Sequence, residues 1–131
     1  MFLDTSGLMC LFDRKDRRHK TAVEHYKVAE SRFTHNYVIA EFIALVVSRR
    51  LPMVPALQFV KALADSQEVF FVWVGQPLHD RGLELLLDRS DKTWSLCDSI
   101  SFSVMSDQKI REALTTDHDF EQAGFVRLLA R

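Results

Sequence analysis

Short apolar runs and longer stretches with helical spacing follow one another along the chain. Residues 69–74 form a continuous run of β-branched and aromatic side chains (VFFVWV), which predicts a central strand buried on both faces. In residues 17–31, Ala22 and Tyr26 fall along one side of a helix and Glu24 falls elsewhere, which predicts a surface helix. The two periods indicate a protein that mixes strands with helices.

Over the whole chain, the pattern predicts strands that alternate with helices. Strands are expected at residues 1–4, 32–36 (strand, then cap), 68–74, 112–116 and 125–130. Helices are expected at about residues 5–12, 17–31, 37–50, 53–66, 77–89, 96–107 and, in short form, 118–124, with Thr34 or Asn36 capping the third. This alternation implies right-handed βαβ crossovers and a mostly parallel sheet, which is the α/β fold class.

Length and composition favour one compact domain over residues 1–131. The 131 residues are 47% hydrophobic and 27% charged, which suits one real core and leaves little room for a second domain. Lys and Arg total 17 against 18 Asp and Glu, giving a formal charge of -1. This balance excludes the bulk basic character of a nucleic-acid coat protein, so any contact with a polyanion must be local.

Cysteine usage and hydropathy exclude further classes. Cys10 and Cys97 are too few for a secreted disulfide framework and lack the close spacing of a zinc site, so both are expected in the core. The longest apolar runs are too short to cross a bilayer and no signal region opens the chain, which predicts a cytoplasmic protein without a membrane partner. Trp73 and Trp94 are expected to pack in the interior, and His79 to lie at the surface.

Four carboxylates stand at positions where an α/β fold gathers its ligands. Asp4 follows the first predicted strand and Asp117 follows the strand at 112–116, so both lie at carboxyl ends of strands. Asp98 stands near the start of an apolar helix, where the helix dipole tolerates negative charge. Glu41 shares its helix face with apolar residues, so its carboxylate is expected to point toward the core and to need a partner there.

Each acid also has an ordinary structural interpretation. Asp117 and Asp119 can cap the helix that follows them, and Asp98 can cap its own helix. Asp4 can serve a turn, and Glu41 a salt bridge. The set of four acids from distant segments favours a common site, because converging like charges need a counterion. With oxygen ligands and no clustered histidine or cysteine, the suitable ion is Mg²⁺ or Mn²⁺, and the natural substrate is a phosphodiester.

Four segments of the chain resemble the acidic motifs of the PIN domain family. They are FLDTS with Asp4, NYVIAEFIAL with Glu41, LCDSISFSVM with Asp98 and ALTTDHDFEQAGF with Asp117, in the family's order along essentially the whole chain. The resemblance implies a three-layer α/β/α domain around a central, mostly parallel sheet. It also implies a ribonuclease that depends on Mg²⁺ or Mn²⁺ and hydrolyses single-stranded or looped RNA.

The resemblance implies roles for individual residues and for partners. The metal-binding catalytic acids would be Asp4, Glu41, Asp98 and Asp117. A hydroxyl such as Ser6 or Thr116 would position a ligand or a water, and Asp119 would be a secondary acid. Small PIN proteins resemble the VapC group of toxins, which implies a homodimer, an antitoxin partner that blocks the site, and restricted RNA targets.

A basic segment lies close in sequence to Asp4. Residues 13–20 include Arg14, Arg17 and Arg18, directly after the first predicted helix. If this segment lines the rim of the site, these side chains would bind RNA phosphates. The alternative interpretation is a solvated charged loop.

Other functions can be compared with the same residues. A haloacid-dehalogenase-like phosphatase needs a second aspartate two positions after the first, where this chain has Ser6. A phospho-acceptor receiver domain needs an aspartate in its central strand and a late lysine, and VFFVWVGQ and FVRLLAR offer neither. A non-catalytic RNA-binding or scaffold module stays open from the sequence alone, because its exclusion requires that the four acids meet in space.

Overall fold

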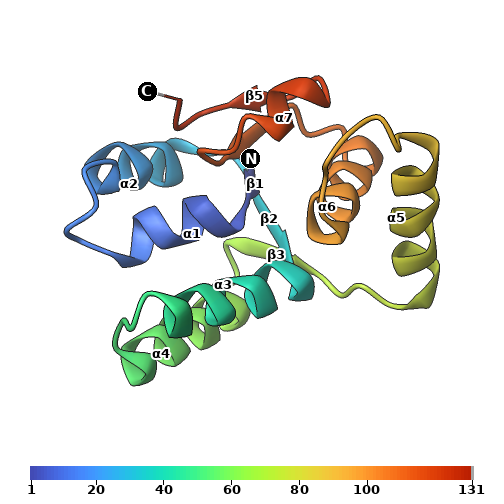
Figure 1. Cartoon of the computed structure of the whole chain (residues 1–131). Helices are drawn as coiled ribbons and strands as arrows, with labels where there is room; N and C mark the ends of the chain where they lie inside the picture. Colours follow the sequence, from blue (N-terminus) through green and yellow to red (C-terminus); the bar gives the residue numbers. More distant parts are fainter. Residues whose placement is uncertain (131) are drawn as a thin grey trace.

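A parallel sheet of five strands forms the centre of the computed structural model, which describes residues 1–130 (Figure 1). The strand order across the sheet is β3-β2-β1-β4-β5, and every neighbouring pair is parallel. The strands are β1 (Phe2–Leu3), β2 (Arg32–His35), β3 (Val69–Val72), β4 (Glu112–Leu114) and β5 (Val126–Arg127). The predicted α/β class with a parallel sheet is confirmed.

Helices cover both faces of the sheet. They are α1 (Thr5–Phe12), α2 (His19–Val28), α3 (Asn36–Ser48), α4 (Met53–Asp65), α5 (Gln76–Asp88), α6 (Leu96–Asp107) and α7 (Asp119–Gln122). Figure 1 shows α1 to α4 on one side of the sheet and α5 with α6 on the other, which is the expected α/β/α layering. Among residues 1–130, no helix has both the length and the apolar character needed to cross a membrane.

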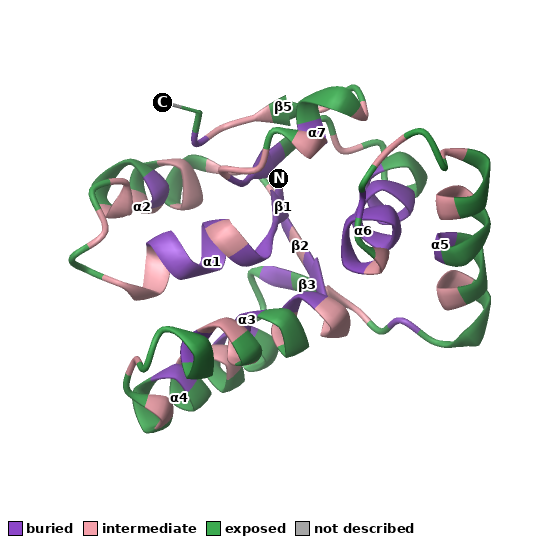
Figure 2. Cartoon of the chain, in the orientation of Figure 1, coloured by how far each residue is buried: buried purple, intermediate pink, exposed green. Residues whose placement is uncertain are grey.

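The helix α6 lies in the interior although its sequence is rich in serine (Figure 2). The buried hydroxyls of Ser101 and Ser103 donate to the carbonyls of Cys97 and Ser99, at 2.8 and 3.1 Å. The Ser99 hydroxyl lies 3.0 Å from the carbonyl oxygen of Gly82 and so links α6 to α5. Because these hydroxyls are paired, their burial does not leave unsatisfied donors in the core.

A buried histidine begins α3, where the sequence predicted Thr34 or Asn36 as the cap. The Nδ1 atom of His35 accepts the Val38 amide at 3.3 Å, and its Nε2 atom lies 2.9 Å from the Ser101 hydroxyl. Burial lowers the pKa of His35 to about 3, so the ring is neutral and its Nε2–H donates to Ser101. The prediction was wrong because Asn36 instead binds the backbone of Val74 from its side chain.

The predicted central position of the strand at 68–74 was also wrong. β3 pairs only with β2 and forms an edge of the sheet, so Phe70 is 58% exposed. Trp73 lies just beyond the last residue of β3 and is 75% exposed, not in the core. Trp94 does pack in the interior, with its ring 5.0 Å from that of Phe102.

Gly7 allows α1 to pack directly on β4. A Cβ atom at this position would lie 1.9 Å from the carbonyl oxygen of Leu114 and 2.7 Å from its carbonyl carbon. A backbone group cannot move aside as a flexible side chain can, so only glycine fits here. Because Asp4 directly precedes α1, this contact also fixes Asp4 beside the loop that follows β4.

We predict that Gly7→Ala lowers the free energy of unfolding by about 2 kcal/mol or more, because the added methyl group forces α1 away from β4. Gly75→Ala is the control, since a Cβ there meets nothing within 4 Å. The control loses only a glycine cap, at a cost below about 1 kcal/mol. Urea denaturation measures both, and equal losses would contradict the close contact at Gly7.

Candidate active site

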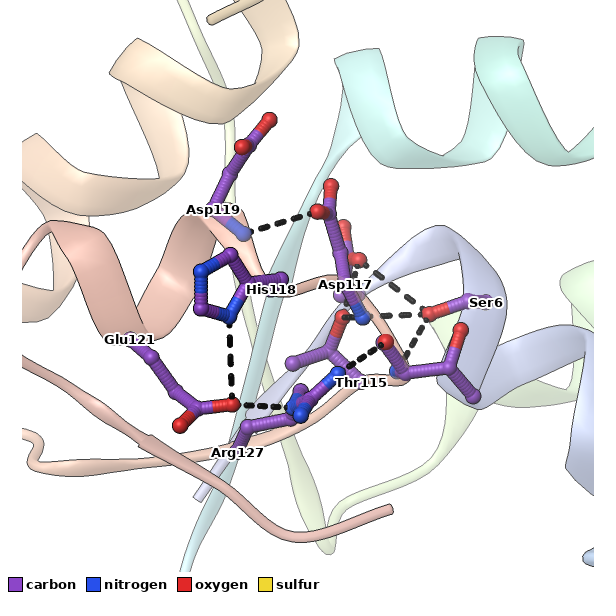
Figure 3. A network of polar contacts seen from close by, with 9 residues as sticks. Ser6, Thr115, Asp117, His118, Asp119, Glu121 and Arg127 are labelled. Carbon is purple, nitrogen blue, oxygen red and sulfur yellow. Dashed lines mark hydrogen bonds and ion pairs between the residues drawn. The ribbon is translucent and has the colours of Figure 1, made fainter. Parts of the chain in front are cut away.

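The first acid of the site is Asp4, which lies between β1 and α1 and is 4% exposed. Its Oδ2 atom accepts the Thr115 hydroxyl at 2.7 Å and the Ser6 hydroxyl at 3.4 Å. The two hydroxyls lie 3.1 Å apart, and Ser6 Oγ also accepts the Thr116 amide at 2.9 Å (Figure 3). The Asp4 carboxylate is therefore held by one side chain from α1, which follows β1, and by one from the loop that follows β4.

The loop after β4 carries two further acids, Asp117 and Asp119. The Asp117 amide donates to Thr115 Oγ1 at 3.0 Å, and Asp117 Oδ1 accepts the Asp119 amide at 2.9 Å. The local hydrogen bond at the start of α7 thus comes from Asp117, and Asp119 is the first residue of the helix. Figure 3 shows that the Asp119 carboxylate points away from Thr115 and Ser6.

Arg127 of β5 supports this loop from behind. Its Nη1 atom donates to the Thr116 carbonyl at 3.0 Å, and its guanidinium forms an ion pair with Glu121. Glu121 Oε1 also lies 3.6 Å from His118 Nδ1 (Figure 3). The Arg127 guanidinium therefore contacts both the loop, through the Thr116 carbonyl, and the Glu121 carboxylate.

Asp98 enters the site from the first turn of α6. Its Oδ2 atom accepts the Ser95 amide at 3.1 Å while Ser95 Oγ accepts the Asp98 amide at 3.0 Å, which is a capping box. The structural interpretation of Asp98 as a cap is therefore correct. It does not exclude a second role, because the structure gives Asp98 Oδ1 no hydrogen bond within residues 1–130.

Three of these carboxylates converge. Asp98, Asp117 and Asp119 each place one carboxylate oxygen within 4.8 Å of the others. Oxygen ligands of this kind suit a hard divalent cation such as Mg²⁺ or Mn²⁺, so the residues present fit such an ion. Asp119, expected only as a secondary acid, belongs to this tight group, whereas Asp4 and Glu41 lie outside it.

The sequence predicted that Glu41 points into the core, and this prediction was wrong. The buried side of α3 is formed by Val38, Phe42 and Val46, and Glu41 is exposed beside it. The pattern of apolar neighbours was misleading because several of them lie at the border of the buried face. The negative charge of Glu41 nevertheless contributes to the raised pKa values of Asp4 and Asp98.

Burial and neighbouring charges raise the pKa values of Asp4 and Asp98. Burial is the main cause that raises the pKa of Asp4 from 3.8 to about 7, and the charges of Asp98 and Glu41 add to it. Burial also raises the pKa of Asp98 to about 6, with a contribution from Asp117. Hydrogen bonds from Thr115 and Ser95 act in the opposite direction, because they stabilise the charged forms.

The predicted RNA-binding arginines divide into two groups. Arg17 and Arg18 line a cavity of about 300 Å³ together with Leu129, whose amide donates to the Thr115 carbonyl at 3.1 Å. The residues that line this cavity include none of the acids. Arg14 lines a different cavity with Pro52 and other residues at the far end of α1.

Two residues of the site were missed from the sequence. The hydroxyl that binds Asp4 belongs to Thr115, whereas Thr116, which was named, contributes its amide and carbonyl. The alternation of side chains along a strand would have distinguished the two only if the inward face of β4 had been known. For Arg127, the sequence shows only a cation in the last predicted strand, which does not indicate a contact with the loop of the acids.

A family model described as the PIN domain matches residues 1–126. The chain belongs to the PIN domain family. Two curated relatives of this PIN domain are the 23S rRNA-specific endonucleases VapC20 of Mycobacterium tuberculosis strains CDC 1551 / Oshkosh and ATCC 25618 / H37Rv. Each is 31% identical over 129 residues, which cover 98% of this chain and 97% of the relative.

Among solved structures, the PIN domain is similar to the crystal structure of Mycobacterium tuberculosis VapC20, described as a sarcin-ricin loop cleaving toxin. The TM-score is 0.85 at 31% identity, and the match covers 95% of each chain. The predicted resemblance is thus confirmed, and the chain is a VapC-like PIN protein.

We predict that Asp4→Asn stabilises the metal-free PIN domain, and more so at high pH. The pKa of Asp4 is raised in the folded state, so folding favours the protonated carboxyl. The stability that this proton provides is therefore lost as the pH rises from about 4 through about 7, and Asn removes the loss. Thermal unfolding in EDTA between about pH 5 and pH 8 measures the effect. Parallel pH profiles for the two proteins would contradict it.

Proposed function

We propose that the chain is a divalent-metal-dependent endoribonuclease and the toxin component of a toxin-antitoxin pair. The observation that carries this proposal is the convergence of Asp98, Asp117 and Asp119 within 4.8 Å, with the buried Asp4 joined to the same loop through Thr115. The likeness to VapC20 over nearly the whole chain supports RNA as the substrate.

The acids hold Mg²⁺ or Mn²⁺ in this proposal. Asp98, Asp117 and Asp119 supply the nearest oxygens, and Asp4 and Glu41 complete the negative site. When bound, such an ion lowers the pKa of a water and neutralises charge on the phosphodiester. The catalytic set in this proposal is Asp4, Glu41, Asp98 and Asp117, with Asp119 as a further ligand.

The surrounding residues keep the carboxylates in place. Thr115 and Ser6 fix the orientation of Asp4, and the Ser95 amide fixes one oxygen of Asp98. Arg127 keeps the loop of Asp117 and Asp119 on the sheet through the Thr116 carbonyl. Oxygens held in this way need little reorganisation when a phosphodiester enters, which favours catalysis.

The alternative of a non-catalytic RNA-binding or scaffold module fits the site less well. A module without chemistry has no use for several carboxylates gathered in one place, because their burial and repulsion cost stability. The raised pKa values of Asp4 and Asp98 are signs of this cost. Acids that converge at a cost to folding favour a catalytic role.

We predict that the protein cleaves RNA in the presence of Mn²⁺ or Mg²⁺. Either EDTA or the Asp98→Asn substitution is expected to lower the cleavage rate by at least about 100-fold. The substrates are a labelled sarcin-ricin stem-loop and an unrelated hairpin. Asp107→Asn is the control, because Asp107 is an exposed acid at the other end of α6 that pairs with Arg81.

The chemistry of the ends tests the mechanism. Attack by water leaves a 5′ phosphate and a free 3′ hydroxyl, which mass spectrometry distinguishes from a 2′,3′-cyclic phosphate. A cyclic product, or full activity in Asp98→Asn, would contradict the proposed role of the acids.

Arg17 and Arg18 bind RNA phosphates in this proposal, and Arg14 extends the basic segment. We predict that replacing Arg17 and Arg18 by Ala weakens RNA binding and lowers the slope of log K against log salt by about 1 to 2, since each phosphate contact releases counterions. Arg49 and Arg50 on α3's C-terminal side supply a control pair. Filter binding measures the RNA affinity of these variants at several salt concentrations, with all proteins also carrying Asp98→Asn to prevent cleavage. An unchanged slope would contradict phosphate contacts by Arg17 and Arg18.

The partners in this proposal are RNA, an antitoxin protein and a second copy of the chain. The likeness to a protein described as a toxin supports the antitoxin. The exposed Phe70 and Trp73, in and just after the edge strand β3, support a homodimer, because a second copy could cover both this unpaired edge and these apolar side chains.

A further inference from the structure

A hydrogen-bonded pair of aromatic side chains, Tyr37 and His79, lies in the space between α3 and α5. The Tyr37 hydroxyl and His79 Nδ1 are 2.6 Å apart, although the residues are 42 positions apart in the chain. Their rings meet edge to face with centroids 6.0 Å apart, and both side chains are half-buried. The sequence had suggested that His79 is only a surface residue.

The pair is on the same side of α3 as the acids. Tyr37 precedes Glu41 by about one helical turn, so the two share a face of α3. The start of α3 also contacts α6 directly, because His35 Nε2 lies 2.9 Å from the hydroxyl of Ser101, about one turn after Asp98. The pair therefore adjoins the acidic site along the carboxyl edge of the sheet.

The position of the pair is fixed by its surroundings. The Val74 amide donates to Asn36 Oδ1 at 2.6 Å, which holds the chain leading into α5 against the start of α3. The His79 amide donates to the Gly75 carbonyl at 3.0 Å in the first turn of α5. The neutral ring of His35 packs against Tyr37 from the other side, with centroids 6.3 Å apart.

The proton arrangement leaves one donor for a ligand. A phenol is the stronger donor and an imidazole nitrogen the stronger acceptor, so the Tyr37 hydroxyl donates to His79 Nδ1. The neutral tautomer then carries its proton on Nε2. Within residues 1–130, the structure gives His79 Nε2 no hydrogen-bond partner.

We infer that Tyr37 and His79 form an RNA-contacting subsite that holds the strand next to the scissile bond. The His79 Nε2–H donates to a phosphodiester oxygen of a flanking nucleotide, and the Tyr37 ring offers a stacking face to its base. This inference rests on the proposed function. A strand whose phosphate is bound at the acids must continue past them, and a preoriented donor at its next phosphate offsets the repulsion by the carboxylates.

The test compares steady-state cleavage of the sarcin-ricin stem-loop by variants of the full chain. His79→Ala is expected to raise KM by about tenfold, the loss of one hydrogen bond to a charged group, with kcat changed less than about twofold. His79→Gln, whose amide can replace Nε2–H, restores most of the affinity. Tyr37→Phe, which releases the orientation of the imidazole, raises KM by about threefold to tenfold.

A matched control is His25→Ala. His25 is also a half-buried histidine, but it lies on α2 and lines a cavity near Met1 at the opposite edge of the sheet. Its replacement is expected to leave KM unchanged. Equal increases of KM in the His25 and His79 variants would overturn the subsite.

Direct binding separates this inference from the proposed function. RNA affinity is measured in the Asp98→Asn background, with and without His79→Ala, alongside melting temperature and mass by light scattering. Weaker binding in the double variant supports the subsite, even if the wild-type chain cleaves no RNA and the proposed function fails. Unchanged RNA affinity overturns it, and loss of dimer with unchanged affinity would assign the pair to a protein contact. A fall of kcat together with melting temperature at unchanged KM would make the pair a structural link only, which also overturns it.

Discussion

The hydrogen bond from the Thr115 hydroxyl to the buried Asp4 carboxylate, 2.7 Å long, is the contact on which the acidic site depends. It joins the segments that leave β1 and β4, two neighbouring parallel strands, at their carboxyl ends. The same Thr115 oxygen accepts the Asp117 amide at 3.0 Å, so one hydroxyl orients the first and the last acidic motif. The approach is possible because Gly7 lets α1 lie on Leu114.

This arrangement makes folding and ligand binding interdependent. The fold brings carboxylates together and buries two of them, Asp4 and Asp98, which raises their pKa values. Donors from Thr115 and Ser95 stabilise the charged forms only in part. A divalent cation that binds the native state alone would offset the remaining repulsion and so stabilise the fold by mass action.

The positions of Asp4 and Asp117 could be predicted because strands that end in an acid at a parallel sheet's carboxyl edge bring those acids together. The orientation of Glu41 could not, since helical spacing gives the neighbours of a residue on its helix but not which neighbours face the core. The exposure of Trp73 depends on strand order, which places β3 at an edge and which a run of apolar residues does not encode. The choice between Thr115 and Thr116 depends on the inward face of β4, which is a tertiary property.

The strand order β3-β2-β1-β4-β5 also sets the order of the polar groups that follow the strands. Arg17 and Arg18 meet Leu129 beyond the β4–β5 end, whereas Tyr37 and His79 follow β2 and β3 at the other end. The acids follow β1 and β4 or lie in the first turn of α6. A polyanion is repelled by the acids alone, so the proposed chemistry requires binding contacts outside the acidic group.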